Sequence, residues 1–460
     1  MSNFKNNKLP YLLHSINPQY FCLAAALGLE FLLMAFRGYG FYFIENYMVI
    51  PVMLFLGMAF GKKLIPLAQR QLWLSLVMVF WFFITQTMHY MMDMDVRSVG
   101  QFTSVYLLAF LFCSFTLDNH RQWGLQLAGI ACIGAALMMV GFTALLVLDI
   151  LPGFLRPHVV WDGARLQAFW HPNICAAIVM MGITFSIYFA AKVKKLWGKA
   201  LLLAIVLVMF LVISLTNSRT SIFITCCIIG GTLFFLIDNH TCMRFLAGAL
   251  VAAATILLLF NLSGAIFQFN NDRMVAQQLQ LEATTSEEGS DEGASEVFVD
   301  PNTGKLALRT DAGQAPLFIT MSNLNGRTDI WQTSLQVLLE NPTVLLLGTD
   351  HSESLLSAYH RFAAAHAHNA WIETTLCLGL PGLVFALVFT LLAAWNVWNT
   401  FWSKQSDLGQ RIIAMLVLCL LGAGILEPYL FFTEIFYHYT DFIFFLCLGY
   451  LIHWRSETSK

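Results

Sequence analysis

Residues 366–396 read HAHNAWIETTLCLGLPGLVFALVFTLLAAWN, so two histidines and an asparagine directly precede a long apolar run. About 20 consecutive apolar residues are enough for a helix to cross the hydrocarbon core of a bilayer. The run therefore predicts a membrane-spanning helix that begins next to His366, His368 and Asn369. Before it lies Ser263–Asn369, the only long hydrophilic stretch of the chain. A water-exposed segment that ends in histidines at a membrane surface indicates chemistry at that surface.

The composition extends this interpretation to the whole chain. Of its 460 residues, 58% are hydrophobic and only 11% are charged, whereas a soluble domain has about 25% charged residues. Because only helices satisfy the backbone within one segment in hydrocarbon, we expect an all-α polytopic membrane protein. Twelve apolar runs have the required length: 19–36, 41–60, 71–88, 101–117, 124–149, 173–191, 197–215, 219–237, 243–262, 370–396, 410–426 and 436–454.

The ten cysteines all lie in the apolar blocks or at their edges. None lies in the long hydrophilic stretch, so a disulfide framework is not expected. The sequence has no Cys-x-x-Cys pair and no Cys/His spacing typical of a metal site. We therefore expect no bound metal and no cofactor, and we expect the bilayer rather than nucleic acid as a partner.

Positive charges give the orientation, because cytoplasmic loops are enriched in Lys and Arg. With the N-terminus inside, the inner side has 15 cations and the outer side 10, of which half lie in the long loop, which the rule discounts. The predicted organisation is nine transmembrane helices in 1–262, an extracytoplasmic loop over 263–369, and three helices with a cytoplasmic C-terminus in 370–460.

Nine of the ten outer cations are arginine, the residue suited to forked phosphate recognition. Chance is the alternative explanation of that bias.

The long loop has two halves of different composition. Residues 274–304 have seven acidic residues among Gly, Ser and Thr, without Lys or Arg after Arg273 until Lys305, which predicts disorder; their spacing matches no calcium-binding loop. Residues 328–364 have the apolar spacing of two short helices. These helices would lie on the membrane surface as a lid, or merely pack on each other.

Four polar constellations fall on the expected outer face. They are Gly163-Ala164-Arg165-Leu166 with Phe169-Trp170-His171-Pro172-Asn173, Asn217-Ser218-Arg219-Thr220, Asn325-Gly326-Arg327, and His366-Ala367-His368-Asn369. An arginine at the membrane edge, such as Arg219, is a functional candidate, with snorkelling to the interface as the alternative. Arg327 beside a helix N-terminus makes an anion site.

The two histidines allow several roles. Histidine is the usual general base near neutral pH, although His366 and His368 could also bind a metal or cap a helix. Arginines without an accompanying carboxylate–histidine cluster suit a diphosphate leaving group, and a histidine base suits deprotonation of a hydroxyl. Together these residues indicate glycosyl transfer from a lipid-linked diphosphate sugar.

The order of these motifs, followed by Gly379-Leu380-Pro381-Gly382, resembles the O-antigen ligase/polymerase family of bacterial envelope proteins over about 160–395. The resemblance implies a GT-C-like fold in the inner membrane and an inverting, metal-independent glycosyltransferase that faces the extracytoplasmic side. It implies an undecaprenyl-diphosphate-linked glycan as donor and a hydroxyl of a glycan, lipid or protein as acceptor. By motif match, Arg219 and Arg327 hold the diphosphate and His368 is the base, with His366 as the competing candidate. Arg165, His171, Asn173 and Asn369 are further substrate-binding candidates.

Two departures from the family pattern concern the loop. The acidic stretch before Asn325 is long, and a single Gly348 stands where a tighter glycine-rich turn is expected. Both affect which acceptor is recognised. A polymerase of the same superfamily is the close alternative to a ligase, because both need the same donor site. A transporter or flippase is the alternative from another class, and it would require polar residues along a path through the helix centres.

Overall fold

A computed structural model of the chain describes residues 121–153, 155, 159–162, 165–168, 172–237, 241–285, 297–299, 306–308, 327–349, 366–427, 430–431 and 438–458, together with 77, 80, 81, 84, 85, 87, 88 and 91. The first four of the twelve expected membrane spans therefore lie wholly or largely outside the described residues. The other eight can be compared with the structure.

Each of those eight apolar runs forms a helix. The long helices are α7 (Arg121–Val147), α8 (Pro172–Lys192), α9 (Leu196–Thr216), α10 (Arg219–Leu236), α11 (Thr241–Thr285), α15 (Ala370–Trp402), α16 (Leu408–Gly424) and α17 (His438–Thr458). Within the described residues, six of them are long and apolar enough to cross a membrane, whereas the apolar parts of α16 and α17 are shorter. A mostly helical polytopic membrane protein is thereby confirmed. The total of twelve spans and the GT-C-like arrangement stay predictions.

Two small hairpins correct the all-helical expectation. Strands β1 (Val159–Asp162) and β2 (Arg165–Ala168) pair antiparallel between α7 and α8. Strands β3 (Val297–Val299) and β4 (Leu306–Leu308) pair in the same way within the long loop. Their alternating residues are too few to stand out in a sequence dominated by apolar helices.

Helix α11 differs from the expectation that the ninth span ends at 262. It continues to Thr285, and its 45 residues extend over roughly 68 Å, about twice the thickness of a hydrocarbon core. The prediction of disorder from 274 is therefore wrong for Met274–Thr285, where the run MVAQQLQLEA favours a helix. Residues 286–296 of the acidic stretch lie outside the described residues.

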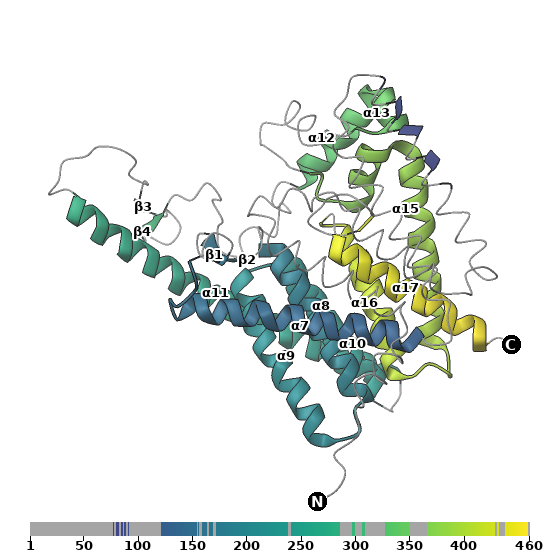
Figure 1. Cartoon of the computed structure of the whole chain (residues 1–460), viewed down its shortest axis with the longest axis horizontal. Helices are drawn as coiled ribbons and strands as arrows, with labels where there is room; N and C mark the ends of the chain where they lie inside the picture. Colours follow the sequence, from purple (N-terminus) through teal and green to yellow (C-terminus); the bar gives the residue numbers. More distant parts are fainter. Residues whose placement is uncertain are drawn as a thin grey trace, which may run out of the picture.

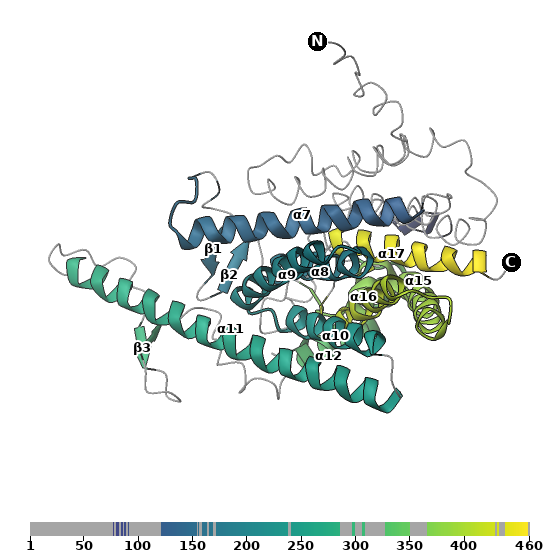
Figure 2. The ribbon, with the colours of Figure 1, turned by 90° about the horizontal axis from the view of Figure 1, so that it is seen from below.

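The helices are arranged around α8. In Figure 2, α7 runs along one side of the molecule and α11 along the other, with α8, α9, α10 and α16 between them. In its membrane-spanning window α8 is 78% buried, whereas the window of α11 is only 11% buried. Helix α8 is therefore the central helix, and the membrane-spanning window of α11 lies at the periphery of the described bundle.

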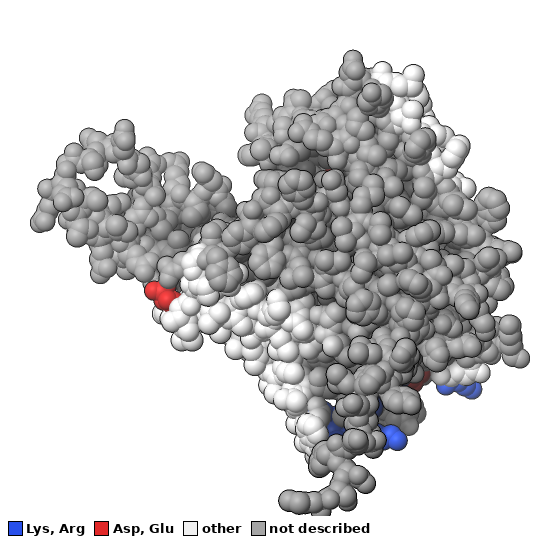
Figure 3. All heavy atoms as spheres, viewed as in Figure 1, with Lys and Arg blue, Asp and Glu red and all other residues white. Residues whose placement is uncertain are grey.

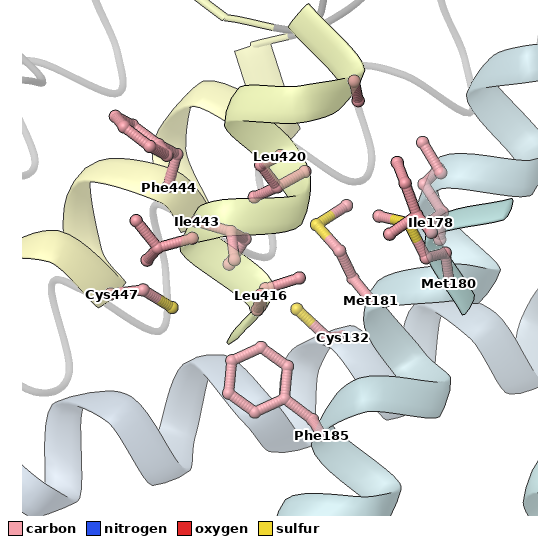
Figure 4. Close-up of a cluster of buried hydrophobic side chains, with 14 of the residues drawn as sticks. Cys132, Ile178, Met180, Met181, Phe185, Leu416, Leu420, Ile443, Phe444 and Cys447 are labelled. Atoms are coloured by element: carbon pink, nitrogen blue, oxygen red, sulfur yellow. The ribbon is translucent and has the colours of Figure 1, made fainter. Parts of the chain in front are cut away.

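The contact between α8 and the C-terminal helices forms the middle of the core (Figure 4). Met181 and Phe185 of α8 point toward Leu416 of α16, with Ile443 of α17 and Cys132 of α7 beside them. All five side chains are fully buried. Lipid tails are as apolar as these side chains, so close packing rather than exclusion from water holds the helices together.

A kink in α15 receives the helices of the long loop. Gly379 has a φ of 68°, and Pro381 follows it inside the helix, so the regular hydrogen bonds are interrupted there. Helix α12 (Arg327–Glu340) and helix α13 (Pro342–Leu347) lie beside this part of α15 (Figure 1). The N–H of Thr349 donates to the Leu376 carbonyl at 2.7 Å. The kink thus anchors the folded half of the loop; residues 351–365 lie outside the described residues.

Two glycines make this anchor possible. Gly348 has a φ of 80°, and a Cβ on it would lie 2.2 Å from the Cys377 carbonyl oxygen. A Cβ on Gly379 would lie 2.3 Å from the Leu346 carbonyl oxygen. Both obstacles are backbone atoms, which cannot rotate away as a side chain can.

Gly348→Ala and Gly379→Ala should each destabilise the protein, because both strain the backbone and separate α13 from α15. A loss of about 1–3 kcal/mol is expected, measured as a lower melting temperature of the detergent-purified protein. Gly134→Ala in α7 is the matched control, since nothing lies within 4 Å of its Cβ position. An equal effect of all three substitutions would contradict this account of the anchor.

Candidate active site

The polar groups predicted to act together meet at one end of the helical bundle, here called the His368 end. The starts of α8, α10, α12 and α15 lie there, with the end of α16 and the β1–β2 hairpin. The hydrogen bonds described below connect these elements. At the opposite end, called the Lys192 end, Lys192 pairs with Asp407 between α15 and α16.

Glu427, three residues after α16, is the centre of the His368 end. Its side chain is 1% exposed. One carboxylate oxygen, Oε1, accepts from Arg327 Nη2 in an ion pair and from Asn173 Nδ2 at 3.2 Å. The other, Oε2, lies 3.3 Å from His368 Nδ1. A single carboxylate therefore joins residues that are as much as 254 positions apart in the sequence.

The electrostatic balance at Glu427 favours its charged form. Burial by itself would raise the pKa of this carboxyl group. The hydrogen bond from His368 and the charge of Arg327 oppose that effect, helped by the charges of His368 and His366. The pKa of Glu427 therefore lies below its usual value. The carboxylate is then a permanent negative charge beside His368 at neutral pH.

The segment His366–Asn369, here called the histidine loop, holds His368 in a defined orientation. A carboxylate can only accept, so the proton shared with Glu427 resides on Nδ1 of the neutral imidazole and leaves Nε2 able to accept a proton. His366 is used differently, because its Nδ1 accepts the backbone N–H of His368 at 3.3 Å. The two rings lie 4.0 Å apart between centroids. His368 is 29% exposed and therefore open to a substrate.

Two further side chains fix this loop to α15. Asn369 caps the helix, because its Oδ1 accepts the N–H groups of Trp371 and Ile372 at 3.0 Å each. Its Nδ2 donates to the Ile425 carbonyl at 3.1 Å. Glu373, fully buried in the first turn of α15, accepts the N–H of Ala367 at 2.6 Å. The backbone on both sides of His368 is thus held by side chains of α15 and its cap.

Arg165 and Asn173 connect the β1–β2 hairpin to the same network. Arg165 Nε donates to the Thr216 carbonyl at the end of α9 at 3.0 Å, and its Nη2 donates to Asn173 Oδ1 at 3.3 Å. Asn173, which follows Pro172 at the start of α8, in turn donates a hydrogen bond from Nδ2 to Glu427. Both residues were expected to contact substrate, and the structure gives both of them protein partners.

Arg219 and Arg327 form a pair of neighbouring cations. Asn217 ends α9 in the left-handed conformation, with a φ of 51°, so that α10 begins two residues later at Arg219. Arg327 is the first residue of α12. Their guanidinium groups are close enough for their charges to repel each other. An anion placed between them would relieve this repulsion.

Both arginines line a cavity of about 1240 Å³ between α10, α11, α15 and α16. Apart from these two cations, the cavity walls are mainly aromatic and aliphatic. They include Phe223, Phe260, Trp371, Leu418 and Leu426. The walls follow α10 and α16 toward Phe235 and Phe401 near the Lys192 end. The cavity is therefore an apolar groove with a pair of arginines at the His368 end.

The structure brings together all but one of the predicted site residues. His171 lies outside the described residues, as do Asn325 and Gly326 beside Arg327. Among the described residues, no group of three or more His, Cys, Asp or Glu side chains could hold a metal ion, and independence of metal stays a prediction. Sequence reasoning missed Glu427 and Glu373. The available signal was an acidic residue at the edge of an apolar run, because such residues are costly unless partnered.

Comparison with known families identifies the segment that forms most of this site. A family model described as O-Antigen ligase matches residues 204–387. This segment is similar to the O-antigen ligase family. The match confirms the resemblance recognised from the motifs. No curated protein matches the chain.

The matched segment includes Arg219, Arg327 and the whole histidine loop. Family members are enzymes, ligases or polymerases, of the O-antigen superfamily, and they use lipid-linked glycans and acceptors in a membrane. Together with the apolar helices, this implies a multi-pass protein of the inner membrane. Arg165, Asn173 and Glu427 lie outside the matched segment and complete the site from the β1–β2 hairpin, the start of α8 and the residues after α16.

The charge of Glu427 gives a pH prediction. Because its pKa is lowered by folding, its contribution to stability is fully present above the unfolded pKa, which is about 4.3 for glutamate. That contribution is lost as the pH falls through the folded pKa. Glu427→Gln removes the titrating group. The difference in unfolding free energy between wild type and Glu427→Gln should therefore shrink as the pH falls below about 4.3. Thermal unfolding at stepwise lower pH measures it, and a difference unchanged down to about pH 3 would contradict the assignment.

Proposed function

We propose that this protein is a ligase that transfers a glycan from an undecaprenyl-diphosphate carrier to an acceptor hydroxyl on the extracytoplasmic side of the inner membrane. The observation that carries the proposal is the apolar groove with Arg219 and Arg327 at one end, where Arg327 pairs with Glu427 and Glu427 in turn contacts His368. A polyprenyl chain suits the groove, and a diphosphate suits the paired guanidinium groups.

The chemistry follows from the positions of these groups. Nε2 of His368 takes the proton of the acceptor hydroxyl, and the imidazolium that forms is stabilised by the Glu427 carboxylate. The acceptor oxygen forms a bond to the anomeric carbon as the bond from that carbon to the diphosphate oxygen breaks. The leaving diphosphate keeps the bonding electron pair. Arg219 and Arg327 stabilise its developing charge.

The geometry favours His368 over His366 as the base. His368 has both a carboxylate partner on Nδ1 and an exposed ring, whereas Nδ1 of His366 already accepts a backbone N–H. Arg165, Asn173 and Asn369 support the site through contacts with protein atoms. We propose that they position Glu427 and the histidine loop.

The described charged side chains also support an enzyme over a transporter. Glu373, Arg219 and Asp441 lie in the first turns of their helices, and Lys192 and Arg411 lie at the other end. In Figure 3 the visible Lys and Arg atoms lie along the lower edge of the molecule, near the lower end of a band of uncharged described residues. A transport path would require polar groups between the two ends.

His368→Ala should abolish glycan transfer while leaving expression and folding intact, because the hydroxyl then loses its base. A loss of about 100-fold or more is expected, measured as transfer from purified lipid-linked donor to acceptor. His366→Ala is the matched control and should retain most of the activity. Full activity of His368→Ala, or equal loss in both variants, would remove His368 as the base.

Arg219→Lys should also impair transfer, because a point charge cannot replace a fork that holds two phosphate oxygens. We expect the loss in kcat to be larger than any rise in KM, since the interaction strengthens as charge develops on the leaving group. If lysine serves as well as arginine at this position, Arg219 is only an anchor at the membrane interface.

The ligase and the polymerase of the same superfamily need the same donor site. A gel of lipid-linked glycans from a deletion strain separates them. Long chains that accumulate on the carrier support the ligase, and single repeat units support the polymerase.

A further inference from the structure

Helix α15 turns back on itself at Gly379. In a straight helix, residues 19 positions apart lie about 28 Å from each other, yet Trp371 Nε1 donates to Thr390 Oγ1 at 3.0 Å. The non-helical backbone of Gly379, with a φ of 68° and a ψ of −166°, makes this contact possible. The segments 370–378 and 380–402 therefore lie side by side, and the second segment alone is long enough to cross a hydrocarbon core.

Trp371 is held from several directions in this arrangement. Its backbone N–H donates to Asn369 Oδ1 at 3.0 Å, so it belongs to the first turn that Asn369 caps. Its ring lies 5.7 Å from the ring of Phe431 between centroids, and a Cβ on Gly424, at the end of α16, would lie 3.4 Å from it. The indole therefore connects the first turn of α15 to the returning segment of the same helix and to α16.

The indole and its partner both line the apolar groove. Ile425, whose carbonyl accepts Asn369 Nδ2, lines the groove as well, so Trp371 lies in the part of the groove beside the histidine loop. Arg219 and Arg327 line the same part. A lipid chain whose diphosphate meets these arginines would therefore pass the indole close to the diphosphate.

The hydrogen bond to Thr390 is not needed for packing alone. The Thr390 hydroxyl already donates to the Ala386 carbonyl at 2.7 Å, so its oxygen is left to accept the indole N–H. A phenylalanine ring would fill most of the same space without a polar group that requires a partner at an apolar wall. The bond instead fixes the orientation of the Trp371 ring.

We propose that Trp371 is a positioning residue that makes the alignment of His368 depend on a lipid chain in the groove. The inference rests on the proposed transfer reaction. A prenyl chain packed on the indole holds it against Thr390, and the indole holds the first turn of α15 and its Asn369 cap, directly after His368. The rate of the chemical step, rather than donor binding alone, then depends on the lipid.

Steady-state kinetics of the purified full-length protein test this proposal. Two donors have the same glycan and diphosphate, one on undecaprenol and one on a prenyl chain of two isoprene units. Wild type should show a higher kcat with the undecaprenyl donor. Thr390→Val keeps the shape of the side chain and removes the acceptor of the indole N–H. It should lower kcat with the undecaprenyl donor roughly five-fold, as for the loss of one hydrogen bond, and leave kcat with the short donor almost unchanged.

Thr400→Val is the matched control. Thr400 lies on the same helix and also donates to the carbonyl four residues earlier, at 2.8 Å, but it does not line the groove. This variant should keep the wild-type ratio of the two kcat values, and Thr390→Ser, which retains the hydroxyl, should restore most of it. An equal fall in kcat with both donors in Thr390→Val would indicate a purely structural role and overturn the proposal, as would equal kcat values of wild type with the two donors.

Hydrogen exchange separates this inference from the proposed reaction, because it requires no transfer. Undecaprenyl diphosphate alone should slow amide exchange over 366–372 in wild type, whereas inorganic diphosphate should not. Thr390→Val should lose most of this protection. Protection without any glycan transfer would support the role of Trp371 and contradict the proposed function. No protection, or equal protection by both diphosphates, would overturn the role of Trp371 even where transfer occurs.

Discussion

The ion pair between Glu427 and Arg327, with His368 on the other carboxylate oxygen, is the interaction on which the rest of the site depends. Breaking a buried pair by removing one partner typically costs about 3–5 kcal/mol. The ion pair therefore holds the start of α12, in the long loop, next to the end of α16. It also makes the orientation of the proposed base, His368, and the position of Arg327, a proposed diphosphate ligand, consequences of the same carboxylate.

The anchor between α13 and α15 makes this ion pair geometrically possible. Arg327 begins α12, whose buried Val337 and Leu338 pack with Leu376 of α15 and Ala367 of the histidine loop. Helix α13 then meets the kink at Gly379. Arg327 and His368 are 41 residues apart in the sequence, and a flexible connection of that length would otherwise leave them far apart on average. The backbone contacts at Gly348 and Gly379 restrict that freedom before any substrate binds.

Hydropathy and motif order predicted much of the fold and most of the site. The start of α8 at Pro172 followed from the preference of proline for the first turn of a helix. The start of α10 at Arg219 followed from the position at which its apolar run begins. Helix α11 beyond 262 was missed, because a polar helix carries no membrane signal. Glu427 was missed because its importance lies in partners 59, 100 and 254 residues away. Sequence periodicity reports local structure and cannot report such contacts.

The groove explains why binding and chemistry are joined in this fold. Helices α10 and α16 provide its walls, and the same two helices carry Arg219 at the start of one and Glu427 just after the end of the other. A lipid chain that fills the groove would therefore press on the helices that position the charged groups. Because packed helices move as units rather than bending freely, occupancy of the groove and alignment of His368 with the diphosphate arginines are expected to be coupled. The donor's lipid would then act as more than a membrane tether, because its chain would help to set the geometry in which its own diphosphate is displaced.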